Sequence, residues 1–414
     1  MTSAPASLGL GLVGCGGFGT YVLDAVAGLP GLRPTAVADP DPVRARALGE
    51  RHGVPAFGSL EELLERADVA AVAIATPPAA HAAMATAALR AGRHVFCEKP
   101  LATTARDARA VAREAERAGR ALVVDHVLRY NPLLRALERL MAEGLLAAPR
   151  RFMFENDASD QDLGPGHWFW DREHSGGIFV EHGVHFFDAA RALLGSDPVS
   201  VRATAVRRPS GPVDMVSADV LHPGGVLASH LHSFTHAHRC ERQTMRLDHG
   251  FAETRVEGWI PVHAEISAWT DEAGARAWEQ LPDRAAALLH VDGFRPHGAE
   301  RVTVTVERDA GSSAPASGRG EVRTVPHHVR AVLDLGGEAR KPHAYRESVR
   351  AAVADLVRVA RDGGTPVADA LAGLTAVAVA EAATLAADTG TEQPVPAPGI
   401  APRPTAPPHL QESS

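Results

Sequence analysis

Hydrophobic and polar positions follow two different patterns along the chain, and the first covers its amino-terminal part. From Leu8 to about Val124, short apolar runs such as LGLGLVG, VAAVAIATP and RALVVDH alternate with Ala-, Arg- and Glu-rich segments of helical composition. Strands that alternate with helices are typical of a mostly parallel sheet with helices on both faces. This pattern predicts a doubly wound α/β domain over residues 1–124.

Beyond Asn131 the pattern changes to longer segments in which branched apolar residues alternate with polar ones. SVRATAVRR, GGVLASHLHSFTH and ERVTVTVERD show a period of two, which is typical of an antiparallel sheet with one solvated face. We therefore expect a second, α+β domain over residues 125–387. The remaining residues, 388–414, are rich in proline and cannot bury a core, so we expect a disordered tail.

Composition and charge are those of an ordinary globular protein. The chain has 414 residues, of which 45% are hydrophobic and 22% charged, and a formal net charge of -8. This mild negative charge, without a basic run interleaved with aromatic residues, argues against a nucleic-acid partner. Three scattered cysteines are too few for a disulfide framework, so we expect a reducing compartment, the cytoplasm. The most apolar stretch, which starts at Leu371, contains Glu381 and predicts a buried helix rather than one in a membrane.

A glycine-rich turn directly follows the first predicted strand. Gly14, Gly16 and Gly19 have the spacing G-x-G-x-x-G between an apolar strand and a helical run. Such glycines permit a tight turn and let a pyrophosphate approach the N–H groups at the helix start. Asp39 ends the second strand, where a carboxylate accepts hydrogen bonds from a ribose diol and repels a ribose phosphate. The pattern predicts NAD, with NADP as the less favoured cofactor. The alternatives are a turn without a ligand and, for Asp39, a cap of the next helix.

Several motifs also occur in an order and spacing that resemble one known family. GLVGCGGFG, VADPDPVRARAL, ATPPAAHAAMATAALRAGRHVFCEKPLA, RYNP and GGIFVEHGVHFFD together resemble the glucose-fructose oxidoreductase and inositol dehydrogenase family, also called Gfo/Idh/MocA. The resemblance implies an NAD(P)-binding Rossmann domain followed by an α+β domain with a large, mostly antiparallel, open sheet. The cofactor-binding residues that it implies are Gly14, Gly16, Gly17, Phe18, Gly19, Asp39, Thr76, Pro77, His81, Glu98 and Lys99.

Lys99 draws attention because lysine is almost absent from the chain. Of the 42 basic residues only Lys99 and Lys341 are lysines. Lysine carries a compact charge and can lose its proton when buried, whereas arginine stays charged. By the resemblance, the Glu98-Lys99-Pro100 turn closes the cleft, and Lys99 reaches the reacting hydroxyl as a proton-exchanging group. The alternative is chance survival of a lysine, as at Lys341.

The segment GGIFVEHGVHFFD supplies the second candidate catalytic element. If it forms a helix after its two glycines, Glu181, His185 and Asp188 fall on one face. His185 is the candidate general base, because an imidazole titrates near neutral pH and can take the hydroxyl proton as hydride leaves. Glu181 would orient His185 and balance its charge, although the family usually has Asp here and the extra methylene moves the carboxylate outward. We expect a structural role for Asp188 and substrate contact for His182.

Other side chains are further candidates for substrate contact. His126, Arg129 and Tyr130 follow the last strand of the first domain and would either contact substrate or pack between the domains. Trp168 and Trp170 would either stack on a sugar ring or pack beneath the active-site loop.

Histidines are concentrated in the segment 230–238. His230, His232 and His236 share one strand face at a period of two. With His182 and His185 nearby, such a row could bind zinc. We favour a solvated or interface row and expect no metal.

These features predict an NAD(P)-dependent dehydrogenase that transfers hydride between nicotinamide and a secondary alcohol or ketone of a sugar, cyclitol or sugar derivative. Its catalytic residues would be Lys99, His185 and Glu181. The alternatives are a redox-neutral, NAD-using enzyme that cleaves a glycosidic bond and a non-enzymatic, cofactor-sensing regulator. Retention of both Lys99 and His185 argues against the regulator. The resemblance further implies a homo-oligomer, a dimer or tetramer, paired through the open sheet.

Overall fold

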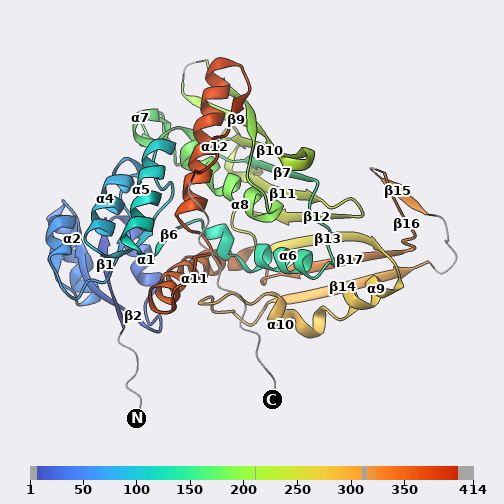
Figure 1. Cartoon of the computed structure of the whole chain (residues 1–414), viewed down its shortest axis with the longest axis horizontal. Coiled ribbons are helices and arrows are strands. Elements are labelled where there is room, and N and C mark those ends of the chain that lie inside the picture. The colour runs from blue at the N-terminus through green and yellow to red at the C-terminus, as the bar shows by residue number, and fades with distance from the viewer. Residues whose placement is uncertain (1–6, 210, 310–314, 319, 400–414) are drawn as a thin grey trace, which may run out of the picture.

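The structure, a computed structural model, describes residues 7–209, 211–309, 315–318 and 320–399. Two large sheets lie side by side, with the amino-terminal sheet on the left of Figure 1 and the second sheet on the right. The predicted division of the chain into an α/β part and an α+β part is confirmed at the level of fold class.

The first sheet has six parallel strands in the order β3-β2-β1-β4-β5-β6. Its strands are β1 (Leu8–Val13), β2 (Leu32–Ala38), β3 (Ala56–Phe57), β4 (Ala71–Ile74), β5 (His94–Cys97) and β6 (Leu122–Val124). Every residue of β4 is buried, as expected for a central strand that helices cover on both sides. The order is that of a Rossmann domain.

Helices connect the successive strands of this sheet. They are α1 (Gly17–Ala25), α2 (Pro42–His52), α3 (Leu60–Leu64), α4 (Pro78–Arg90) and α5 (Ala105–Ala118). The side chain of Asp41 accepts hydrogen bonds from the N–H groups of Val43 and Arg44 and so caps α2. Because Asp41 caps α2, Asp39 does not, and the structure excludes the alternative role considered for Asp39 above.

The second sheet has ten strands in the order β14-β17-β13-β12-β11-β7-β10-β9-β8-β18. They are β7 (Arg151–Asp157), β8 (Ser200–Arg207), β9 (Val213–His222), β10 (Val226–Ser233), β11 (Arg242–Asp248), β12 (Ala252–Glu257), β13 (His263–Thr270), β14 (Arg301–Arg308), β17 (His327–Asp334) and β18 (Gln393–Pro394); β15 (Ala316–Gly318) and β16 (Glu321–Arg323) form a separate hairpin. All neighbours are antiparallel except β7 and β10. Burial alternates along β9, so one face of the sheet is packed and the other is open.

Helices pack on one face of the second sheet and between the sheets. They are α6 (Pro132–Ala142), α7 (Arg172–Ser175), α8 (Val184–Leu194), α9 (Glu272–Glu279), α10 (Ala285–Leu288), α11 (Lys341–Asp362) and α12 (Ala370–Thr389), with the short segments η1 (Val127–Tyr130), η2 (Trp168–Trp170), η3 (Phe179–Gly183), η4 (Pro223–Gly225), η5 (His238–Cys240), η6 (Pro282–Arg284) and η7 (Glu338–Arg340). In Figure 1, α11 and α12 stand between the two sheets. α11 contacts α1, and α12 contacts both α5 and β8, so these helices join the two parts of the molecule.

One described helix, α12, is long and apolar enough to cross a membrane, with a mean hydropathy of 1.7. In this fold 67% of that apolar window is buried, because α12 packs against α5, α8 and β8. The structure therefore shows α12 as a core helix.

The carboxy-terminal segment begins with more structure than its proline content predicts. α12 continues to Thr389, and Gln393 and Pro394 then pair with the edge strand β8. Val395 is buried and donates its N–H to the carbonyl oxygen of Val199. The prediction of a disordered tail from residue 388 is thus wrong over these residues, because the open edge of β8 offers backbone partners that a composition argument does not see. Residues 400–414 lie outside the described residues.

Candidate active site

The carboxyl ends of the parallel strands bring the predicted segments to one edge of the first sheet. The glycine turn follows β1, Asp39 follows β2, Thr76 follows β4 and Lys99 follows β5. The strand order reverses between β1 and β4. Ligands of open α/β sheets bind at the carboxyl ends beside such a reversal.

Two glycines of the turn, Gly14 and Gly19, are required by the fold, and two others, Gly16 and Gly17, leave space beside the turn for a ligand. A Cβ at Gly14, where φ is 94°, would lie 2.4 Å from the carbonyl oxygen of Ala75, and a Cβ at Gly19 would lie 1.8 Å from that of Gly14. By contrast, no described atom lies within 4 Å of a Cβ built on Gly16 or Gly17. No side chain caps α1, so the first N–H groups of this helix remain for a ligand. The turn therefore fits a dinucleotide pyrophosphate.

Asp39 is held beside this turn by two backbone groups. Its carboxylate accepts hydrogen bonds from the N–H of Cys15 at 2.7 Å and from the N–H of Asp41 at 2.8 Å. A carboxylate has about four lone-pair directions, so these two bonds orient Asp39 and leave acceptor capacity for a ribose diol. This arrangement supports the predicted role of Asp39.

His81 lies between the two loops that carry Thr76 and Lys99. It is buried on α4, with Nδ1 2.7 Å from the carbonyl oxygen of Pro100 and Nε2 2.7 Å from that of Thr76. A neutral imidazole has one N–H, so it donates to one of these two carbonyl oxygens at a time. His81 thereby helps to hold the two loops together, and its expected contact with the cofactor stays a prediction.

Lys99 lies in a buried group of carboxylates. Its Nζ is 2.6 Å from Oε1 of Glu181 and 2.9 Å from the carbonyl oxygen of the same residue. Burial alone would lower the pKa of Lys99, but Glu181, Glu98 and Asp125 together hold it above its ordinary value. This direction favours an ammonium that donates hydrogen bonds, and the expected proton exchange at Lys99 stays a prediction. The third N–H of Nζ remains for a substrate oxygen.

Asp125 belongs to this group, although sequence reasoning did not select it. It directly follows β6 and is 2% exposed, and its Oδ1 has no partner among the described residues. Burial raises the pKa of Asp125 to about 7, although Lys99 opposes the rise. Burial also raises the pKa of Glu98 well above its usual range. The signal in the sequence was an acidic residue directly after an apolar strand, at the edge where the other site residues lie.

The segment that carries Glu181 and His185 is not one regular helix. Phe179–Gly183 forms a π-helical turn, and α8 begins only at Val184. Glu181 pairs with Lys99. Lys99 also lies near enough to His185 to lower the pKa of His185, so Glu181 and His185 both lie beside Lys99, and the expected orientation of His185 by Glu181 stays a prediction.

His185 lies in the cleft as a neutral base. It is 8% exposed, and its Nδ1 has no partner among the described residues. Burial, reinforced by the nearby charge of Lys99, holds the pKa of His185 well below its ordinary value. A neutral imidazole is the form that can accept a proton.

A row of aromatic rings connects the glycine turn with His185. Phe18 stacks on Tyr21 at 6.0 Å between ring centroids, and Tyr21 stacks on Tyr345 at 5.2 Å. Trp259 contacts Tyr345 at 5.2 Å and His185 at 6.3 Å. Two of the three tyrosines of the chain, Tyr21 and Tyr345, lie in this aromatic row. The scarcity of tyrosine is the one signal in the sequence that could have identified the row.

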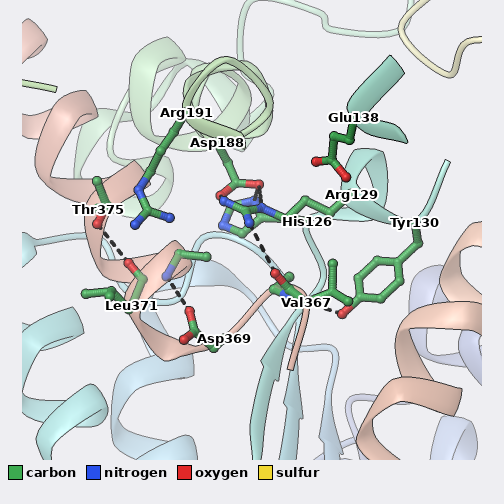
Figure 2. A network of polar contacts seen from close by, with 12 residues as sticks. His126, Arg129, Tyr130, Glu138, Asp188, Arg191, Val367, Asp369, Leu371 and Thr375 are labelled. Carbon is green, nitrogen blue, oxygen red and sulfur yellow. Dashed lines mark hydrogen bonds and ion pairs between the residues drawn. The ribbon is translucent and has the colours of Figure 1, made fainter. Parts of the chain in front are cut away.

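Arg129 and Tyr130 belong to a polar network behind the cleft (Figure 2). Arg129 donates from Nε and Nη2 to both carboxylate oxygens of Asp188, at 2.7 and 2.8 Å, and from Nη1 to the carbonyl oxygen of Val367. Tyr130 donates to Asp355 at 3.0 Å. Of the two alternatives left open for these residues, the structure shows packing between the domains rather than substrate contact.

His126 and Trp170 are also placed by packing. His126 is 1% exposed, with Nδ1 3.9 Å from Asp188, and burial lowers its pKa to about 4. Trp170 donates from Nε1 to the carbonyl oxygen of Leu163 and meets Phe169 edge to face at 4.9 Å. Both ring nitrogens of His126 lack a hydrogen-bond partner among the described residues, whereas the one polar atom of the Trp170 side chain is satisfied.

The predicted row of strand histidines is only partly present. His230 and His232 lie on the packed face of β10, but β10 ends at Ser233 and His236 is half exposed beyond it. His182 lies against His232 instead, at 5.2 Å between ring centroids. Within the described ranges, no three His, Cys, Asp or Glu side chains are arranged to hold a metal ion.

Comparison with protein families assigns both parts of the chain. Residues 8–126 match the model GFO_IDH_MocA, described as an oxidoreductase family with an NAD-binding Rossmann fold. Residues 134–250 match the GFO/IDH/MocA C-terminal domain.

Curated relatives match over part of their length. The chain is 34% identical over 195 residues to inositol 2-dehydrogenase of Rhizobium meliloti (strain 1021), which is 47% of this chain and 57% of that protein. It is 32% identical over 241 residues to dTDP-3,4-didehydro-2,6-dideoxy-alpha-D-glucose 3-reductase of Streptomyces violaceoruber, which is 57% of this chain and 70% of that protein. The chain thus spans little more than half the length of the first of these relatives.

Solved structures share the fold over nearly the whole chain. A putative myo-inositol dehydrogenase from Sinorhizobium meliloti 1021 has a TM-score of 0.67 at 22% identity, over 94% of this chain and 100% of that one. Levoglucosan dehydrogenase in complex with NADH has a TM-score of 0.72 at 20% identity, with the same coverage.

Proposed function

The chain belongs to the GFO/IDH/MocA oxidoreductase family, and from that premise we propose that it is an NAD-dependent dehydrogenase of a secondary alcohol on a sugar, cyclitol or sugar derivative. The observation that carries the proposal is the meeting of Lys99 and Glu181, 82 residues apart in the chain, in the cleft that also holds the neutral His185. A cofactor-sensing regulator would not need this arrangement of a donor and a base.

The residues of the first domain would hold the cofactor. Gly16 and Gly17 leave space for the pyrophosphate, and Asp39 would bind the ribose diol. NAD, when bound, supplies the hydride acceptor.

The cleft residues divide the remaining chemistry between them. The free N–H of Lys99 would hold the substrate oxygen, and Glu181 fixes the direction of the ammonium. His185, which is neutral, would take the hydroxyl proton as the carbonyl forms. Because Glu181 engages Lys99, its contribution is to position the donor rather than the base.

A substrate screen tests the proposal. The purified protein with NAD is mixed with polyols, including myo-inositol, with free sugars and with nucleotide sugars, and NADH is followed by its absorbance. We expect NADH formation with at least one of them. Turnover of a glycoside without net NADH would instead identify a redox-neutral enzyme, and no turnover in either assay would reject the proposal.

We predict that NAD binds at least about tenfold more tightly than NADP, because a ribose phosphate would meet the carboxylate of Asp39. Isothermal calorimetry with both cofactors measures the two Kd values. Asp39→Ser should weaken NAD binding and reduce the difference between the Kd values of NAD and NADP. Equal or tighter binding of NADP to the parent protein would contradict this prediction.

We further propose a cytoplasmic homo-oligomer, a dimer or tetramer, paired through the open face of the second sheet. That face carries charged pairs, including Arg246 with Glu253, together with the half-exposed Trp269. Light scattering should give a mass of at least two chains. A monomer at micromolar concentration would contradict it.

A further inference from the structure

Four histidines, three of them buried and one partly buried, extend from the active site through the packed face of the second sheet. This histidine row consists of His182, His232, His230 and His222. His182 contacts His232 at 5.2 Å between ring centroids, and His232 is parallel to His230, with centroids 6.2 Å apart and an interplanar angle of 7°. His182 lies three residues before His185 in the chain, and it lies near enough for its charge to lower the pKa of His185, the proposed base.

The middle of the row has polar atoms that packing alone does not explain. Both ring nitrogens of His230 and both of His232 are buried and have no partner among the described residues. Their surroundings are apolar, since Phe154 contacts His232 and Phe187 contacts His230. A buried polar atom without a partner costs stability, so a Phe or Leu would suit these positions better if they only filled space.

The far end of the row leads towards solvent. His230 and His222 line one cavity of about 10 Å³, together with Arg191. A volume of this order holds about one water molecule, which could bridge the two rings. His222 then contacts Ser196, whose neighbour Asp197 is half exposed.

We propose that the histidine row carries the proton released in alcohol oxidation from His185 to solvent behind α8. The inference rests on the proposed dehydrogenase function, which supplies the proton: the substrate loses a hydride to NAD and a proton to His185, and the row returns that proton to water. Each neutral ring accepts a proton at one nitrogen and releases one from the other, and a water in the cavity lined by His230 and His222 bridges that gap.

The charges around the row favour short residence of the proton on any one ring. Burial lowers the pKa of all four histidines, that of His182 to about 3. Lys99 faces His182 and lowers its pKa further. At the other end, Asp197 raises the pKa of His222 while Arg191 lowers it. Each end of the row thus carries a paired cation and carboxylate, Arg191 with Asp197 at the solvent end and Lys99 with Glu181 at the other.

The test uses His230→Leu and His232→Gln, with His249→Gln as the matched control. His249 is another buried histidine, in the turn between β11 and β12, and lies outside the row. NADH absorbance and a pH-indicator dye are followed together by stopped flow in weak buffer, with NAD and either myo-inositol or the most active polyol of the screen. Thermal unfolding of each variant without cofactor is measured in parallel.

In the parent and in His249→Gln, we expect protons and NADH to appear together. In both row variants, proton release should lag behind NADH, kcat should fall roughly tenfold and its solvent deuterium isotope effect should rise. The midpoint of unfolding of His230→Leu should stay equal or rise, because two unpartnered nitrogens are removed.

Row variants with kcat and proton release within about twofold of the parent would overturn the relay while leaving the dehydrogenase intact. A fall in kcat that both variants show together with a lower unfolding midpoint would overturn it as well, since the row would then be structural. Absence of NADH in the parent would reject the proposed function and the relay with it.

Discussion

Replacing Lys99 by Arg is expected to lower kcat by about 10²–10³-fold, the contribution typical of one hydrogen-bond donor at the reacting oxygen. The reason is geometric. Two N–H groups of the ammonium are fixed by the side chain and the backbone of Glu181, and the third is left for the substrate. A planar guanidinium keeps the charge but cannot present this arrangement at the same point.

Steady-state kinetics with NAD and the screened polyol measure this loss, and His185→Ala should be at least as severe. Lys341→Arg is the matched control, because it makes the same change at the only other lysine, at the start of α11 and outside the cleft. The Kd of NAD should stay within about threefold of the parent value in all three variants. A Lys99→Arg protein with kcat within about threefold of the parent would show that Lys99 persists by chance.

The sequence was sufficient for the fold because its patterns report local geometry. Short apolar runs separated by helical segments can form only a few arrangements, and the observed order of the first sheet is one of them. The glycine spacing was equally informative, since Gly14 and Gly19 are required by contacts less than 3 Å from a built Cβ. A period of two predicted the second sheet, although it could not reveal that β7 and β10 run parallel.

The site was less predictable where it depends on register and on contacts between distant segments. Spacing placed Glu181 and His185 on one helix face, but it could not show the π-helical turn at Phe179–Gly183 or the pairing of Glu181 with Lys99. Asp125 was not selected from the sequence, because its burial and its position beside Lys99 arise from the tertiary fold and are not visible in a local pattern. The roles of Arg129 and Tyr130 depend on residues more than 50 positions away.

The buried ion pair between Arg129 and Asp188 should contribute far more to stability than an exposed pair of similar geometry. Arg129→Ala leaves the carboxylate of Asp188, which is fully buried, without its partner, and a loss of about 3–5 kcal/mol in the free energy of unfolding is expected. The matched control is Arg172→Ala. Arg172 pairs with Asp388 at 2.6 Å, but both side chains are about half exposed, so the loss there should be below about 1 kcal/mol.

Urea unfolding measures the loss of stability in both variants. The double variant Arg129→Met with Asp188→Leu then shows whether the larger loss comes from an unpaired buried charge or from the loss of the ion pair itself. If the loss comes from the unpaired buried charge, the double variant should regain most of the stability, because neither charge then remains in the apolar site.

The ion pair between Arg129 and Asp188 should also make the free energy of unfolding depend on pH. Despite burial, Arg129 holds the pKa of Asp188 below its ordinary value, so the contribution is complete above the ordinary pKa of an aspartate and is lost as pH falls through the lower, folded value. Equal losses in Arg129→Ala and Arg172→Ala would contradict this account, since burial is the main difference between the two pairs.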